Sequence, residues 1–339
     1  MMHMASAIRR DGGPPPRRGG RQRRAVVAVG GNALTREDQL GTHGQIADNA
    51  AGMARSLSAL LDSGWRVAVV HGNGPQVGNL AIQQDAAGAT VPAQPMHQLT
   101  AMTQGQLGGT LAREIDRLRG PGSAVAVVTH VFVDPDDPAF GHPTKPIGPF
   151  LDAAQAAGLA GRRGWQVVED SGRGHRRVVP SPHPLEIVEI TAIRALLAAG
   201  TVVLAAGGGG VPVTRGTDGA LTGADAVIDK DHAAAVLGTS IGAEELYLLT
   251  GVDAVQLDFG TPRQRPVHAL APDEAATHLA AGQFPAGSMG PKVAAALRFV
   301  QDGGRRAIIT SADRLPAAVA GEPGAGTRIE AVRAEMGVS

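Results

Sequence analysis

The sequence predicts an α/β fold in which βαβ units build a mostly parallel central sheet. Short apolar runs alternate along the chain with stretches of helical periodicity, which is typical of such units. Three of the apolar runs lead directly into "GGNAL", "HGNGPQVG" and "GGGGVPV". Because ligands of open α/β sheets bind beyond the carboxyl ends of the strands, we expect these three loops to line one crevice.

The elements are predicted in chain order from these patterns. The first strand consists of Ala and Val alone, as expected where helices cover both faces of a parallel sheet. Strands are predicted at 25–29, 65–70, 124–128, 201–206, 245–250 and 306–310. Helices are predicted at 45–61, 98–118, 186–198, 226–237, 272–281 and 291–302.

Composition narrows the class of protein. A length of 339 residues with 43% hydrophobic residues is enough for one large domain or two lobes. The absence of Cys excludes thiolate chemistry and favours a cytoplasmic location. Six Phe, two Trp and one Tyr leave little for base stacking, so we expect no nucleic-acid partner. No segment approaches the length of a membrane span, so no membrane partner is expected either.

The first 24 residues differ from the rest of the chain. They hold seven Arg and one acidic residue, with a run of Pro and Gly and no apolar pattern. We therefore expect residues 1–24 to form a disordered basic leader. A tether for nucleic acid or a membrane surface is the alternative function of such a leader.

Two further breaks in the pattern suggest how the chain is divided. Residues 130–183 are rich in Pro, Asp and Gly and lie between predicted core strands, which favours an inserted lid subdomain over a plain loop. The pattern breaks again between Pro212 and Gly223. We therefore expect two lobes, 25–213 with the lid and 214–339.

The glycine-rich loops are candidates for binding an anion. The loop 71–78 opens a helix near Pro75, so its N–H groups and the helix dipole would favour negative charge. Four successive glycines at 207–210 cost backbone entropy, which favours close approach of a ligand. A tight strand-to-helix turn is the alternative in both places. Neither loop has the glycine spacing of a Rossmann or Walker A motif.

The first loop has no cation of its own, because no Lys or Arg lies between residues 25 and 34. Three lysines elsewhere could supply the charge. Lys230 lies between two aspartates in the predicted helix 226–237, and Lys292 follows Pro291 in the first turn of a helix, where a phosphate could compensate its charge. Lys145 lies in "PTKPIG", whose prolines stiffen the backbone. The alternative is that each lysine is simply solvated.

Taken together, the motifs resemble those of the carbamate kinase family within the amino-acid kinase superfamily, from about Ala25 to Thr327. The motifs are "GGNAL", "HGNGPQVG", "MTQGQLGG", "PTKPIGPF", "GRGHRRVVPSP", "GGGGVPV", "AVIDKD", "LTGVDAV", "GSMGPK" and a final "GT". The resemblance implies an open αβα sandwich with a mostly parallel sheet, an acceptor lobe (25–213), a nucleotide-binding lobe (214–339) and a protruding lid at about 130–183. It also implies a homodimer.

The resemblance further implies reversible phosphoryl transfer between ATP and carbamate, giving ADP and carbamoyl phosphate, with Mg²⁺ carried by the nucleotide and no metal ligand on the protein. The implied catalytic residues are Lys145, Lys230 and Asp231, with Lys145 supplying the cation that the first loop lacks. The implied carbamate- and phosphoryl-binding residues are Gly30, Gly31, Asn32, Gly72, Asn73 and Gly74. The implied nucleotide-binding residues are Gly207, Gly208, Gly209, Thr250, Val252, Asp253, Met289 and Lys292.

Three positions depart from the family pattern, namely Gly109, His130 and His183, where a Tyr, a Gln and a Lys or Glu are usual. These departures leave the identity of the acceptor open. A kinase of another small carboxylate is therefore one alternative. A nucleotide-binding sensor without turnover is another, although it would be expected to lack at least one of the three lysines.

Overall fold

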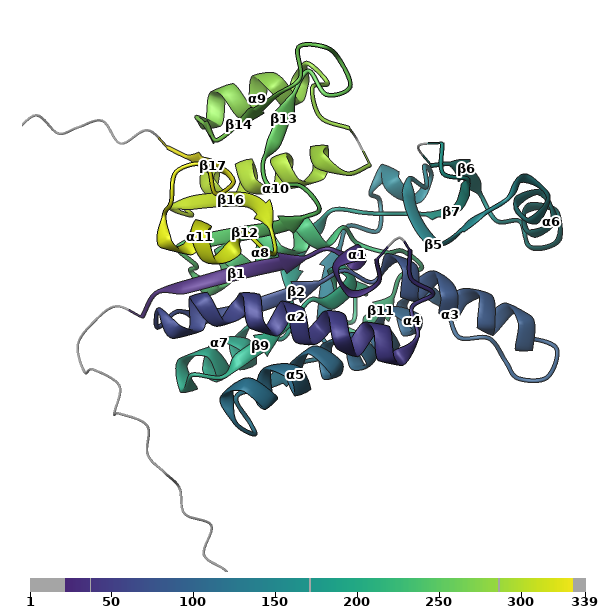
Figure 1. The fold of residues 1–339 in the computed structure, drawn as a ribbon. Coiled ribbons are helices and arrows are strands. Elements are labelled where there is room, and N and C mark those ends of the chain that lie inside the picture. The colour runs from purple at the N-terminus through teal and green to yellow at the C-terminus, as the bar shows by residue number, and fades with distance from the viewer. Residues whose placement is uncertain (1–21, 37, 171, 286, 332–339) are drawn as a thin grey trace, which may run out of the picture.

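A central eight-stranded sheet organises the protein. The computed structural model describes residues 22–331 except 37, 171 and 286, so the expected leader lies almost entirely outside the described residues. The strand order is β15-β17-β16-β12-β1-β2-β9-β3, and every neighbouring pair is parallel except β16 and β17 (Figure 1). The predicted α/β class with a mostly parallel sheet is therefore confirmed.

The bounds of the elements are as follows. The central sheet contains β1 (Arg24–Val29), β2 (Arg66–His71), β3 (Ala124–Ala126), β9 (Val202–Leu204), β12 (Glu245–Thr250), β15 (Ala269–Leu270), β16 (Arg306–Ser311) and β17 (Thr327–Glu330). Smaller sheets contain β4 (His130–Val133), β8 (Pro184–Ile187), β10 (Val211–Arg215) and β11 (Leu221–Gly223), then β5 (Lys145–Leu151), β6 (Val167–Glu169) and β7 (His175–Val179), and finally β13 (Val255–Leu257) and β14 (Arg265–Val267). The helices are α1 (Gly31–Leu34), α2 (His43–Asp62), α3 (Gly74–Ala87), α4 (Met96–Thr103), the π-turn η1 (Gln104–Gly108), α5 (Gly109–Arg119), η2 (Pro138–Phe140), α6 (Ala153–Arg163), α7 (Ile190–Ala199), η3 (Gly207–Gly209), α8 (Lys230–Ile241), α9 (Pro272–Ala280), α10 (Met289–Gln301) and α11 (Leu315–Ala320).

Helices cover both faces of the central sheet. Val26 and Ala28 of β1 pack in an apolar cluster that includes residues of α7, α8 and α10. Val27 and Val29 point to the other face, into a cluster with residues of α2, α5 and α11. Full burial of one such Val side chain contributes about 1.5–3 kcal/mol. The alternation of β1 between two cores explains why its sequence is apolar at every position from Ala25 to Val29.

A small subdomain projects from the rest of the molecule on the right of Figure 1. It consists of the antiparallel sheet β5-β7-β6 and α6, residues 145–179, which we call the lid. Strand β4, which also lies within 130–183, pairs instead with β8, just after this segment, and with β10 in a separate four-stranded sheet. The projecting part is thus the middle of the segment that composition singled out.

The predicted helix 226–237 begins later than expected. Residues 226–228 are buried and non-helical, and Asp229 is the N-cap of α8, which starts at Lys230. An Asp side chain at this position accepts a backbone N–H of the first turn, and this satisfies a donor that the helix leaves open. The prediction extended the helix through an apolar stretch because such a run fits either a helix or extended chain.

Three other boundaries also differ. The predicted helix 186–198 begins only at Ile190, because its first residues belong to β8. The predicted strand 201–206 ends at Leu204, since Ala206 adopts a positive φ of 50°. The predicted helix 98–118 is interrupted by the π-turn η1. These errors concern short runs, where periodicity distinguishes helix from strand poorly.

Candidate active site

A cleft of about 960 Å³ lies at the carboxyl ends of β1, β2, β12 and β16, and the lid contributes to its wall. Ten of the residues expected at the site line it: Gly30, Gly72, Asn73, Gly74, Lys145, Gly208, Lys230, Asp231, Thr250 and Lys292. Seven Lys and Arg side chains face four Asp side chains in the lining. The cleft is therefore suited to an anionic ligand, because low-dielectric walls strengthen the field of an excess of one sign of charge.

The cleft wall at α3 offers backbone N–H groups. Helix α3 begins at Gly74, and its N-cap residue Asn73 makes no side-chain capping bond. Instead, the buried Asn73 amide donates to Thr103 Oγ1 at 3.0 Å, which fixes its orientation. The N-terminus of a 14-residue helix without a side-chain cap carries partial positive charge and backbone N–H groups that lack an acceptor, so it favours an anion.

The glycines of η3 are required by protein packing rather than by a ligand alone. A Cβ on Gly207 would lie 2.2 Å from His71 Nε2, and one on Gly209 would lie 2.3 Å from the Ile228 carbonyl oxygen. A Cβ on Gly208 would lie 2.2 Å from Asn73 Nδ2. The loop thus packs tightly against its neighbours, and Gly208 is the one of these three that lines the cleft.

Asp231 joins two of the predicted lysines. Its carboxylate accepts hydrogen bonds from Lys230 Nζ at 3.0 and 3.1 Å and from Lys292 Nζ at 2.8 Å. Only 2% of the Asp231 side chain is exposed. Burial acts to raise the pKa of Asp231, but the two adjacent ammonium groups outweigh it and hold that pKa below its usual value. The carboxylate therefore stays ionised between the lysines and orients both toward the cleft.

Lys145 reaches the same region from the lid. Its ammonium group donates to the carboxylate of Asp229, the N-cap of α8. Burial acts to raise the pKa of Asp229, but Lys145 and Lys230 lower it well below the usual range. All three predicted lysines are thus brought to one end of the cleft, although 147 positions separate the first from the last in the sequence.

Five predicted nucleotide-binding residues do not line the cleft, namely Gly207, Gly209, Val252, Asp253 and Met289. Asp253 accepts a hydrogen bond from Ser311 at 2.6 Å, and Ser311 itself lines the cleft. Gly31 begins α1, and the side chain of Asn32 lies outside what the structure describes. The three departures from the family pattern, Gly109, His130 and His183, lie outside the cleft lining.

Sequence reasoning missed several polar residues of the cleft, including Arg36, Arg55, Arg173 and Arg176. Arg176 lies on β7 and donates through Nε to the Gly148 carbonyl oxygen at 3.1 Å. Burial lowers the pKa of Arg176, and the ion pair with Asp170 opposes this effect. The signal for it was the motif "GRGHRR", which was noticed but given no role.

The lid contacts α3 through two glycines. A Cβ on Gly78 would lie 2.1 Å from both the Cα and the nitrogen of Gly148, which has a φ of +77°. Gly78 and Gly148 are the last glycines of "HGNGPQVG" and "PTKPIG". Their contact explains why each motif has a glycine at that position. Helix α3 and strand β5 can approach this closely only because neither residue carries a side chain.

We expect Gly78→Ala to lower kcat by about tenfold, because β5 must move away from α3 and Lys145 moves with it. A displacement of about 1 Å at a reacting group can cost up to 10²-fold in rate. Gly44→Ala in α2 is the matched control, since a Cβ there meets nothing within 4 Å. Steady-state kinetics of both variants check this expectation. Wild-type kcat in Gly78→Ala would contradict the role of the contact.

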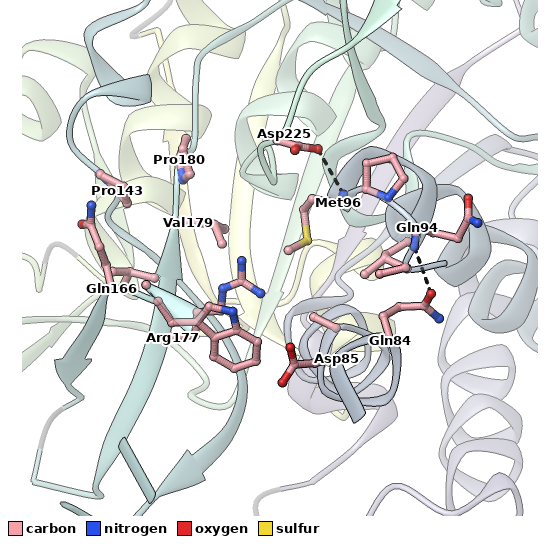
Figure 2. A pocket seen from close by; sticks show the side chains of 17 residues that line it. Gln84, Asp85, Gln94, Met96, Pro143, Gln166, Arg177, Val179, Pro180 and Asp225 are labelled. Carbon is pink, nitrogen blue, oxygen red and sulfur yellow. Dashed lines mark hydrogen bonds between the residues drawn. The ribbon is translucent and has the colours of Figure 1, made fainter. Parts of the chain in front are cut away.

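A second cavity, of about 410 Å³, lies between the lid and the helices α3 and α4 (Figure 2). Arg177 reaches into it from β7, with its guanidinium 4.2 Å from the centre of the Trp165 ring. Asp85 and Asp225 line the facing side. None of the residues expected at the site lines this cavity, so the lysine and glycine-loop chemistry belongs to the larger cleft.

The fold and the lysine-lined cleft define an α/β phosphotransferase, and comparison with known proteins agrees. The chain matches the Amino acid kinase family over residues 23–311. The carbamate kinase of Pyrococcus furiosus is 44% identical over 304 residues, which span 88% of this chain and 96% of that protein.

Solved structures give the same result. Carbamate kinase from Giardia lamblia bound to citric acid is 36% identical with a TM-score of 0.86, over 91% of this chain and 99% of that one. The Giardia lamblia structure bound to AMP-PNP is 37% identical with a TM-score of 0.82, over the same shares of the two chains. The chain belongs to the amino acid kinase family and, within it, to the carbamate kinases.

In the part of the chain that the structure describes, no helix combines the length and the apolar character needed to span a membrane.

Proposed function

We propose that the cleft catalyses reversible phosphoryl transfer between ATP and carbamate, giving ADP and carbamoyl phosphate. The observation that carries this proposal is the convergence of Lys145, Lys230 and Lys292 on one end of the cleft, where Asp229 and Asp231 orient their ammonium groups. Three cations beside an uncapped helix N-terminus suit a group with three charged oxygens.

The chemistry requires little beyond positioning and neutralisation of charge. A carbamate oxygen is already an anionic nucleophile, so no general base is needed. This oxygen forms a bond to the γ-phosphorus as the bond to the bridging oxygen breaks, and ADP leaves with the electron pair. Charge spreads over the equatorial oxygens during transfer, and preorganised cations stabilise it.

Each wall of the cleft has a part in this scheme. Gly30, Gly31, Gly72 and Gly74 offer backbone N–H groups to carbamate and to the transferring group, and Asn32 and Asn73 belong to the same loops. Lys145 and Lys230 contact the transferring phosphoryl group, whereas Lys292 holds phosphate oxygens that bound nucleotide already presents. Asp231 accepts hydrogen bonds from Lys230 and Lys292 and keeps these two lysines aligned.

The nucleotide would lie along the wall formed by Gly208, Thr250, Gly251 and Ser288, all of which line the cleft. The Giardia lamblia relative bound to AMP-PNP supports a nucleotide in this family. Gly207 and Gly209 support this wall from behind, and we place Val252, Asp253 and Met289 beside it. Lobe 214–339 is thus the nucleotide-binding lobe, and 25–213 with the lid is the acceptor lobe.

Mg²⁺ would enter with the nucleotide and neutralise charge on its phosphates. The described residues contain no cluster of three or more His, Cys, Asp or Glu side chains that could hold a metal ion. Asp229 and Asp231 each already contact lysine ammonium groups. This donor set fits an ion that is carried by phosphate oxygens.

The family resemblance also supports a homodimer, and the lack of Cys supports a cytoplasmic enzyme.

The test is ATP formation from ADP and Mg²⁺ with carbamoyl phosphate, compared with acetyl phosphate and other acyl phosphates. We expect kcat/KM for carbamoyl phosphate to be highest by at least about tenfold, which corresponds to about 1.4 kcal/mol in transition-state binding. A preference of the same size for another acyl phosphate would overturn the choice of acceptor and leave the kinase chemistry intact.

A further inference from the structure

The two carboxylate oxygens of Asp229 have different partners. Oδ1 accepts the backbone N–H of Asp231 at 2.8 Å and so caps α8. Oδ2 accepts a hydrogen bond from the ammonium group of Lys145, which lies at the first residue of β5. One side chain therefore connects the lid to the helix that carries Lys230 and Asp231.

This connection is sheltered from solvent. The side chain of Asp229 is 14% exposed and that of Lys145 is 27% exposed, so bulk water screens the pair only in part. Burial acts to raise the pKa of Asp229, but the adjacent ammonium groups of Lys145 and Lys230 outweigh it and favour the ionised carboxylate. Asp229 is thus a fixed anion to which a lysine on a separate subdomain can attach.

A lysine without such a partner would be poorly placed for catalysis. Lys has four rotatable side-chain bonds, and fixing them in one conformation costs conformational entropy. Its ammonium group has three N–H donors. When one donor is held by Asp229, the position of Nζ is set and two donors remain for phosphoryl oxygens. The entropy cost is then met before the transition state forms.

We propose that Asp229 is the positioning residue of Lys145, holding its ammonium group where the phosphoryl group is transferred. This inference rests on the proposed function, since it concerns the same site. It goes beyond an N-capping role, which needs only Oδ1. It also differs from the role of Asp231, which orients Lys230 and Lys292.

Asp229→Asn separates the two functions of the carboxylate. The Asn carbonyl oxygen can still cap α8, because Asn and Asp are equally good N-caps. The amide NH₂ that replaces Oδ2 cannot accept a hydrogen bond from Lys145. We expect kcat to fall by about 10–100-fold, as is typical when a group that orients a functional side chain is removed, with KM for ATP within about twofold. Asp229→Ser can also cap α8, and we expect it to show the same fall in kcat.

A double-mutant cycle with Lys145→Met supplies the decisive comparison. If Asp229 acts through Lys145, then Asp229→Asn should change kcat by less than about twofold once Lys145 is Met, because coupled residues are not additive. Asp152→Asn is the matched control. The Asp152 carboxylate caps α6 by accepting the Gln155 backbone N–H at 2.8 Å, and the Asp152 backbone N–H donates to the Gln155 side-chain oxygen at 3.0 Å. We expect the kcat of Asp152→Asn to match wild type.

The outcomes separate this inference from the proposed function. Wild-type protein that forms no ATP from carbamoyl phosphate would refute the function itself. An active wild type with full kcat in Asp229→Asn would overturn the positioning role. So would a loss that persists undiminished in the Lys145→Met background, or an equal loss in Asp152→Asn.

Discussion

Replacing Lys145 by Met should lower kcat by about 10²–10³ while leaving KM for ATP nearly unchanged. Lys145 is the cation that the lid brings to the cleft, where Asp229 holds its ammonium group. Its contact with the phosphoryl group strengthens as charge develops in transfer, so its removal acts mainly on the transition state. Loss of one such preorganised donor typically costs about 2.7–4 kcal/mol. Steady-state kinetics at saturating carbamate and Mg-ATP measure the effect.

Lys292→Met is the control for that measurement, because we place it on phosphate oxygens that bound ATP already presents. It should raise KM for ATP in addition to lowering kcat. A kcat for Lys145→Met within about threefold of wild type would mean that Lys145 is a solvated lid residue. The cation would then have to come from Lys230 alone.

Replacing Asp231 by Ala should reduce the free energy of unfolding by about 3–5 kcal/mol, as expected when one partner of a buried ion pair is removed. Lys230 and Lys292 would remain beside each other with side chains only 11% exposed and no shared counter-ion. Urea unfolding of both proteins measures the difference. The control is Asp302→Ala, which breaks the more exposed pair with Arg298 on α10 and should cost less than about 1 kcal/mol.

The difference in stability between wild type and Asp231→Ala should also depend on pH. The pKa of Asp231 is lower in the folded protein than in the unfolded chain, so its contribution to stability is fully present above the unfolded value, about 3.9. That contribution is lost as pH falls through the folded-state pKa. The stability gap between wild type and Asp231→Ala should therefore be constant near neutral pH and narrow in strong acid. A gap that widens on acidification would contradict this assignment.

The sequence predicted the sheet and the place of the site well for a physical reason. Buried parallel strands such as 25–29 and 245–250 must be apolar at nearly every position, which leaves a clear signal. The loops that follow such strands meet at one edge of the sheet. The three glycine-rich loops were therefore expected at one crevice, and Gly30, Gly72 and Gly208 from them line the cleft. The three lysines were expected there because of the resemblance to the family's motifs, and they line the same cleft.

Besides the boundary errors in short runs, two errors arose where a residue's partner is distant in the sequence. Asp229 was placed inside the predicted helix 226–237, whereas it caps α8 and binds a lysine 84 positions earlier. The glycines of η3 were attributed to ligand approach, but His71 and Ile228 by themselves leave no room for a side chain on Gly207 or Gly209. A single sequence does not show which segments pack against each other, so these contacts could not be derived from it.

The most direct test of the whole account is a crystal structure with ADP, Mg²⁺, carbamate and aluminium fluoride, which mimics the transferring phosphoryl group. We expect the ammonium groups of Lys145 and Lys230 at hydrogen-bond distance from fluoride, about 3 Å. Lys145 should still contact Asp229, and Lys292 should contact phosphate oxygens of the nucleotide. Fluoride bound elsewhere in the cleft, with Lys145 turned away from it toward solvent, would contradict the account.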